Sequence, residues 1–173
     1  IQTDSLNILT DPIWSLRASP LSSYGPIRHA PPGIDFENLP PIDLVLVSHN
    51  HYDHMDLETL RKLSRTFHPR ILVGLGNAEF LTKRGVSGVE ELDWWQAVQV
   101  TPGVSVTATR AQHFSARWIT DRWRTLWLGF VFSGPSGRIY FAGDTGLGDF
   151  IRMVKDRFHP FRLVILPIGP GLP

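Results

Sequence analysis

The feature that most constrains the fold of this chain is a short apolar strand that leads directly into a cluster of histidines. Residues 42–47 form a nearly continuous apolar run, which is typical of a strand buried on both faces. Ser48 and the segment His49-Asn50-His51-Tyr52-Asp53-His54 follow at once. Buried strands of this kind belong to folds with layered sheets and helices, where functional side chains gather at strand ends. We therefore predict an α/β or α+β fold with a functional site after this strand.

The rest of the chain supports a layered fold, because predicted strands outnumber predicted helices and helices separate some of them. Strands are predicted over residues 1–2, 6–9, 71–73, 104–109, 126–132, 138–142 and 163–166, and helices over 57–67, 77–85 and 150–157. Asp56 suits the N-cap of the first helix, whereas Asn77 and Gly85 suit the start and end of the second. The irregular stretch from Asp11 to Pro41 is long enough to indicate a functional loop.

Metal-ligand types stand at the ends of three predicted strands: residues 49–54, His113 and Asp144. On extended backbone, alternate side chains point the same way, so His49 and His51 can bind one ion together. Asp53 and His54 follow as the chain turns and can face a second ion. Two-metal hydrolases hold their ions about 3.5–4 Å apart. A later aspartate such as Asp144 suits the carboxylate that both ions share.

The residue types also limit which metal is expected. The chain has no cysteine, so any metal must be held by His, Asp or Glu. Neutral imidazoles with carboxylates favour zinc, while manganese and iron remain open. A single histidine is more often a surface or packed residue, and we interpret His29, His68 and His159 in that way. Three histidines and an aspartate within six residues are much harder to explain as packing.

Several motifs add a resemblance to a known family. The pattern His-x-His-x-Asp-His after a buried strand resembles the signature of the metallo-β-lactamase-fold hydrolases, and Gln112-His113 and Gly143-Asp144-Thr145-Gly146 are similar to the next two ligand motifs. Further segments resemble the N-acyl-phosphatidylethanolamine phospholipase D branch: residues 9–15 with Asp-Pro-Ile-Trp, 17–20, 40–43, 91–95 with the Trp-Trp pair, and 167–169.

The resemblance implies a four-layered αβ/βα sandwich and a two-zinc site. By this likeness His49, His51 and His113 bind one zinc, Asp53 and His54 bind the second and act in catalysis, and Asp144 bridges. The implied activity is phosphodiester hydrolysis of phospholipase D type on N-acyl phosphatidylethanolamine-like lipids, through a hydroxide that bridges the metals. We expect Tyr52 to line the substrate pocket. A lactonase, or another small-molecule hydrolase of the same fold, is the alternative.

The resemblance further implies a last histidine ligand downstream of residues 167–169 and a strand before Ile1. We therefore expect residues 1–173 to be a single hydrolase domain truncated at both ends, and a fragment without activity stays an open alternative. The formal net charge of +1 argues against a nucleic-acid partner. Residues 117–127 interleave Trp and Arg, which suits either a lipid headgroup interface or core packing with solvated arginines. We expect a cytoplasmic protein, with peripheral membrane contact left open.

Overall fold

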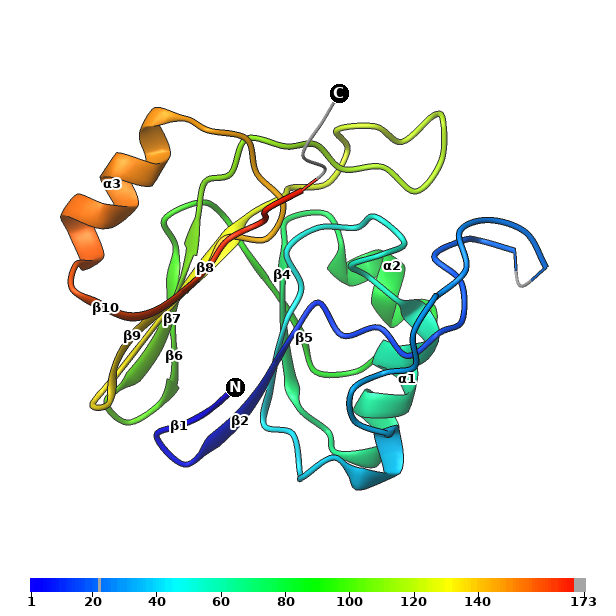
Figure 1. Ribbon diagram of the computed structural model, residues 1–173, viewed down its shortest axis with the longest axis horizontal. Helices are drawn as coiled ribbons and strands as arrows, with labels where there is room; N and C mark the ends of the chain where they lie inside the picture. Colours follow the sequence, from blue (N-terminus) through cyan, green and yellow to red (C-terminus); the bar gives the residue numbers. More distant parts are fainter. Residues whose placement is uncertain (22, 170–173) are drawn as a thin grey trace.

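The computed structural model describes residues 1–21 and 23–169, and within them the strands form two facing sheets of five strands each (Figure 1). The first sheet has the order β1 (Gln2–Thr3), β2 (Leu6–Thr10), β3 (Leu44–Leu46), β4 (Arg70–Gly74), β5 (Val89–Leu92). The second has the order β10 (Phe161–Ile165), β9 (Gly137–Phe141), β8 (Gly129–Gly134), β7 (Val104–Thr109), β6 (Ala97–Thr101). Helices lie outside both sheets, so the layers run αβ/βα and the predicted fold class is confirmed.

Three apolar clusters hold these layers together. The central cluster lies between the sheets and joins inward side chains such as Leu44 and Leu72 to Val106 and Phe130. A second cluster joins the outer face of the first sheet to α1 (Leu57–Thr66) and α2 (Ala78–Thr82). A third joins the second sheet to α3 (Asp149–Phe158). Burial of each such side chain contributes about 1.5–3 kcal/mol to the stability of the fold. Because the central cluster takes its side chains from both sheets, both sheets are needed to complete it.

Strand direction decides where the loops that carry ligands meet. β2 and β3 pair in parallel, so Asp11 after β2 lies beside the histidine segment after β3. In the second sheet β7 and β9 are each antiparallel to β8, and they therefore run in the same direction. His113 follows β7 and Asp144 follows β9, so both residues emerge at one edge of that sheet.

The predicted helix caps differ in outcome. Asp56 caps α1, because its carboxylate accepts from the backbone N–H of Glu58 and of Thr59. Asn77 stands at the N-cap position of α2, but its side chain donates to the carbonyl of Gly74 at 2.7 Å instead of capping the helix. The carboxylate of Glu91 accepts from the N–H of Ala78 at 2.6 Å in its place. Asn77 therefore occupies the expected N-cap position, but the acceptor for the first turn comes from a neighbouring strand.

The sequence also missed two strands and displaced others by a few residues. β5 and β6 are edge strands, and edge strands carry more polar residues than the buried runs on which the prediction relied. The strand predicted over residues 126–132 is displaced to β8. Leu126 and Leu128 instead donate their N–H groups to the carbonyls of Leu75 and Ser48, which follow β4 and β3. β1 with β2 and β8 with β9 form antiparallel hairpins, and Asp4 and Ser5 have positive φ angles of 49° and 63°, as a tight two-residue turn requires.

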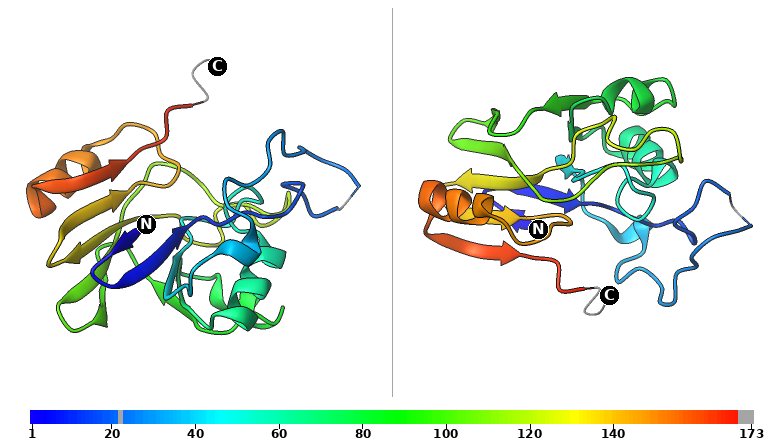
Figure 2. Two further views of the ribbon diagram at one scale, coloured as in Figure 1. Left: turned by 60° about the horizontal axis from the view of Figure 1, so that its bottom comes forward. Right: turned by 90° about the horizontal axis from the view of Figure 1, so that it is seen from above.

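The long segment after β2 projects from the layers, as both views in Figure 2 show for residues 11–21 and 23–35. It exposes several apolar side chains, among them Leu16, Leu21 and Tyr24. A short 3₁₀ helix, η1 (Phe36–Asn38), returns the chain to the body, where Phe36 is buried. Among the described residues, no helix is long and apolar enough to cross a membrane.

Candidate metal centre

Three histidines from two loops converge at the edge where the strands end. The ligand atoms of His49, His51 and His113 all lie within 4.8 Å of one another. His49 Nε2 is 2.8 Å from His51 Nδ1, and His113 Nε2 is 3.3 Å from the same atom. His49 is 2% exposed and forms the floor of the cluster. The structure therefore brings together the three residues that were expected to share the first ion.

Burial keeps these imidazoles neutral. Desolvation, with the nearby histidines adding to it, lowers the pKa of His49 to about 2. Burial likewise lowers the pKa of His51 and the pKa of His113 below the ordinary value of 6.5. A neutral imidazole carries the free electron pair that a metal ligand needs, so this trio is ready to bind a cation without first losing protons.

His54 and Asp144 form the other half of the cluster. His54 Nε2 is 3.3 Å from Asp144 Oδ2 and 3.7 Å from Asp53 Oδ2. Burial opposes a charge on His54, but its pairing with Asp11 and Asp144 outweighs burial and raises its pKa to about 10. The hydrogen bond with His54 in turn lowers the pKa of Asp144 to about 2. Asp53, His54 and Asp144 line an open hollow of about 300 Å³.

Asp11 is a site residue that the sequence prediction did not include. Its Oδ2 lies 2.6 Å from His54 Nδ1, and it accepts the hydroxyl of Ser48 at 2.6 Å. Its Oδ1 accepts the backbone N–H of Ser48 at 2.7 Å. Because the Ser48 hydroxyl donates to Asp11, its lone pairs accept from His49 Nδ1 at 2.9 Å, which leaves His49 Nε2 free.

Asp11 also belongs to a second possible ligand group, with His49 and His54. We interpret it as a positioning residue, since both of its oxygens are already engaged by Ser48 and His54. A usable signal was present in the sequence: Asp11 ends a strand, as the ligands do, and Asp11-Pro12 is part of the Asp-Pro-Ile-Trp motif. What the sequence did not give was the pairing of β2 with β3.

The donor set fits a metal centre. The nitrogens of His49, His51 and His113 point at one another from neutral rings, an arrangement that a cation satisfies better than shared protons. Hydrogen bonds to the far nitrogens of His49 and His54 fix the orientation of these rings, as is usual for histidines that bind metals. Nitrogen and carboxylate donors without sulfur suit zinc, manganese or iron.

Tyr52 points away from the ligands. Its ring lies 4.0 Å from the guanidinium of Arg117, and both side chains line a groove of about 850 Å³. Leu16, Phe80 and Trp118 are among the other residues of that groove. The structure therefore places Tyr52 in the wall of a large groove next to the histidines, and its contact with substrate stays a prediction.

The tryptophans of residues 117–127 divide between the two interpretations. Trp127 packs against Trp94 with ring centroids 6.0 Å apart, and its Nε1 donates to the carbonyl of Ala111 at 3.0 Å. Trp118 and Trp123 are 61% and 63% exposed. Trp127 therefore fits core packing, whereas the two exposed rings lie at the surface.

The remaining histidines of the chain lie outside the cluster and are exposed: His29, His68 and His159.

Comparison with curated proteins finds relatives along almost the whole chain. An uncharacterized protein of Mycobacterium tuberculosis is 40% identical over 171 residues, which cover 98% of this chain and 45% of that protein. An N-acyl-phosphatidylethanolamine-hydrolyzing phospholipase D of Caenorhabditis elegans is 34% identical over 180 residues, covering 98% and 50%. A metal-dependent hydrolase of Methanopyrus kandleri is 30% identical over 175 residues, covering 98% and 67%. The chain spans about half the length of the first two relatives.

Solved structures share the fold at lower identity. A metallo hydrolase from Ignicoccus hospitalis superposes with a TM-score of 0.71 at 23% identity, covering 97% of this chain and 65% of that one. A diiron β-hydroxylase from Streptomyces venezuelae gives a TM-score of 0.68 at 23% identity, covering 94% and 31%. Likeness at this level of identity shows the arrangement of the layers and no more.

A family model assigns the chain directly. The model described as "Beta-lactamase superfamily domain" matches residues 6–170, from the start of β2 to beyond β10. The matched span contains all the residues that the structure gathers at the strand ends, from Asp11 to Asp144. This chain therefore belongs to the beta-lactamase superfamily domain family.

Proposed function

We propose that the whole protein is a metal-dependent hydrolase with a two-metal site. In this site His49, His51 and His113 hold one ion, and Asp53 and His54 hold the other. The observation that carries the proposal is the position of Asp144: its Oδ2 lies 3.3 Å from His54 Nε2 and 3.8 Å from His113 Nε2. One carboxylate oxygen thus reaches both halves of the cluster, as a carboxylate shared by two ions must.

A pair of divalent ions bound here would supply an acidified water and positive charge for a developing oxyanion. The protein contributes the electrostatic setting, because burial keeps His49 neutral and the pairing with His54 keeps Asp144 ionised. Asp53 is 66% exposed at its side chain and lines the open hollow, which supports a role for it in accepting a proton from water there. By its donor set the site is expected to hold zinc, with manganese and iron as alternatives.

For the substrate we propose a phosphodiester of the N-acyl phosphatidylethanolamine type. Support comes from the relatives in Caenorhabditis elegans and Saccharomyces cerevisiae, which are 34% and 36% identical and are named for hydrolysis of that lipid. The groove beside Tyr52 has apolar walls from Leu16 and Leu21, which suits a substrate with acyl chains. The exposed Trp118, which lines that groove, and the exposed Trp123 suit contact with a membrane that holds the substrate.

The test uses the full-length protein loaded with zinc. Phosphodiester cleavage is measured on N-acyl phosphatidylethanolamine and on a chromogenic phosphodiester, with a lactone as the rival substrate. We expect phosphodiester turnover in the wild type and a loss of at least about 100-fold in Asp144→Asn, in line with the removal of a group central to the transition state. Asp149→Asn is the matched control, because the side chain of Asp149 is 95% exposed and lies five residues further along the chain.

The outcomes separate the candidate activities. Hydrolysis of the lactone alone would favour the small-molecule hydrolase. A protein that binds two metals and cleaves none of the three substrates would refute the phosphodiesterase. Metal analysis by mass spectrometry on the same samples identifies the ion.

A further inference from the structure

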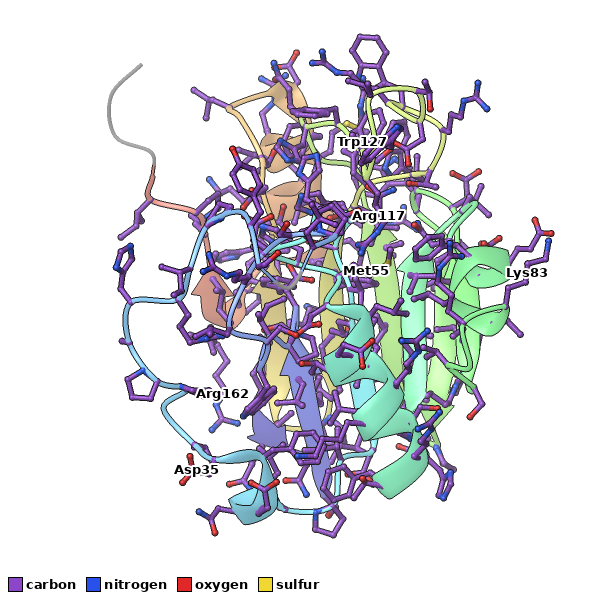
Figure 3. All side chains as sticks on the ribbon, turned by 90° about the vertical axis from the view of Figure 1, so that its right-hand side faces the viewer. Asp35, Met55, Lys83, Arg117, Trp127 and Arg162 are labelled. Atoms are coloured by element: carbon purple, nitrogen blue, oxygen red, sulfur yellow. The ribbon has the colours of Figure 1, made fainter. Side chains whose placement is uncertain are left out.

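Arg117 reaches from its own loop to the backbone of the histidine segment. Its Nη1 donates to the carbonyl of Asn50 at 2.9 Å and to the carbonyl of Met55 at 2.8 Å. Figure 3 shows Arg117 and Met55 close together where the loops gather at the strand ends. These two carbonyls bracket residues 51–54, which carry three of the proposed ligands. One guanidinium nitrogen thus ties together both ends of what we name the histidine turn, residues 51–55.

A third contact fixes the turn from its side. The guanidinium carbon lies 4.0 Å from the centroid of the Tyr52 ring, and Tyr52 is the central residue between His51 and Asp53. Only a planar cation can stack on a ring while it donates along its edge to two carbonyls. A lysine would place a point charge there and could not stack on the Tyr52 ring.

Within the turn the backbone has a simple design. The N–H groups of His54 and Met55 both donate to the carbonyl of His51, at 3.1 and 2.8 Å. These bonds close the turn, but they do not set the distance between its two ends. Asn50 is only 3% exposed, so its carbonyl needs a donor from the protein, and Arg117 supplies one.

Arg117 is itself held firmly. The backbone N–H groups of Arg117 and Trp118 donate to the carboxylate of Asp121 at 2.9 and 2.8 Å. The hydroxyl of Ser115, which is fully buried, donates to the carbonyl of Thr125 at 2.6 Å and closes the loop. The same loop between β7 and β8 contains His113, so one segment both supplies a proposed ligand and clamps the turn that supplies three more.

From this geometry we infer that Arg117 is a positioning residue, which holds the histidine turn in its metal-binding shape before any ion arrives. The inference rests on the proposed metal site, although its structural part, the ordering of the turn, does not need a metal. Arg117 donates to backbone and stacks on Tyr52, and no ligand role is assigned to it. Its loss is therefore expected to loosen the turn without removing a ligand.

The experiment compares Arg117→Lys and Arg117→Ala with the wild type in the full-length protein. Arg124→Ala is the matched control, because Arg124 is an exposed arginine of the same loop. Zinc affinity is measured by competition with a chromophoric chelator, and amide hydrogen exchange of residues 51–55 is measured on metal-free protein. We expect both Arg117 variants to bind zinc about 10- to 100-fold more weakly, as is typical when an outer partner of a metal ligand is lost. We also expect faster exchange at His54 and Met55, with Arg124→Ala like the wild type.

A rescue arm separates positioning from general destabilisation. Methylguanidinium added to Arg117→Ala should restore part of the zinc affinity and slow the exchange, whereas it should not affect Arg124→Ala. If Arg117→Ala fails to fold by circular dichroism, Arg117→Lys carries the test. Wild-type zinc affinity and wild-type exchange in Arg117→Lys would overturn the inference. A wild-type protein that binds neither zinc, manganese nor iron would refute the proposed function instead, and exchange in the turn would still decide the role of Arg117.

Discussion

At the scale of single residues, Asp11 connects the two halves of the site. Its carboxylate reaches His54 directly and reaches His49 through the hydroxyl of Ser48. In His49 the proton therefore faces away from the proposed ion and the free electron pair faces toward it. In His54 the proton shared with Asp11 also faces away, and an ion would replace the proton on the other nitrogen. One side chain that touches no metal thus sets the orientation of a ligand in each half.

Asp11→Asn is expected to weaken both stability and metal binding. The amide keeps the shape of the carboxylate but has only one acceptor oxygen, so at least one of its three present donors loses its partner. We expect a loss of about 1–3 kcal/mol in the free energy of unfolding, from a buried group left unsatisfied. We also expect zinc to bind about 10- to 100-fold more weakly. Urea denaturation and chelator competition provide the two measurements.

Asp43→Asn is the control for this change. Asp43 is exposed and also accepts a backbone N–H, from Asn7 at 2.8 Å, but it stands at the start of β3, away from the ligands. The Asp43→Asn variant should bind zinc as tightly as the wild type. Equal zinc affinities in Asp11→Asn and Asp43→Asn would contradict the role of Asp11.

At the scale of elements, the turn after β9 is shaped by close approach to the turn after β3. Gly143 has a φ of 62°, and a Cβ built on it would lie 2.5 Å from the Cβ of Ser48. The glycine therefore allows Asp144 to reach the histidines, because any side chain at position 143 would push Ser48 and the Asp11 network aside. The turn after β3 in the first sheet and the turn after β9 in the second thus approach so closely that there is no room for a methyl group between them.

Gly143→Ala should disturb the site more than backbone strain alone explains. Gly103→Ala is the matched control, because Gly103 has a φ of 80° with open space around its Cβ position. Both variants should lose at least about 1 kcal/mol of unfolding free energy from the positive φ. We expect only Gly143→Ala to show a further loss and weaker zinc binding. Equal destabilisation of the two variants, with unchanged zinc affinity, would show that the contact with Ser48 is not limiting.

At the scale of the whole molecule, the site makes the stability of the metal-free protein depend on pH in two opposite ways. Below pH 6.5 the unfolded chain protonates His49, whereas the folded protein keeps it neutral down to about pH 2, so acid favours unfolding. Above pH 6.5 the unfolded chain releases the proton of His54, whereas the folded protein holds it up to about pH 10, so alkali favours unfolding as well. The contribution of this pair is therefore greatest near pH 6.5.

We expect the unfolding free energy of chelator-treated protein, measured by urea denaturation at a series of pH values, to be greatest near pH 6.5. His54→Gln should remove the alkaline decline. It should also alter the acid side, because His54 helps to lower the pKa of His49 and of Asp144. Zinc should also remove the alkaline decline, because the ion replaces the proton on His54 and adds about 2.7 kcal/mol when present at 100 times its dissociation constant. A metal-free profile that keeps rising above neutral pH would contradict the pairing of His54 with Asp11 and Asp144.

The sequence by itself determined the fold class and the set of residues at the centre. The apolar run before His49 predicted a buried strand, and the histidine spacing predicted ligands that share one face. Both are local consequences of strand geometry. The structure gathers His49, His51, His54, His113 and Asp144 as the sequence led us to expect. The edge strands β5 and β6 escaped prediction because their burial is partial and their pattern is correspondingly weak.

Only the tertiary structure decided which residues support that centre. The position of Asp11 follows from the parallel pairing of β2 with β3, and the position of Arg117 from contacts between the loop after β7 and the segment after β3. Neither residue type is rare, and although Asp11 stands at the end of a strand, the sequence does not indicate which residues either side chain contacts. Their contacts join residues 37 to 67 positions apart in the chain. Contacts over such separations depend on how the layers pack, a property of the folded molecule that no local pattern encodes.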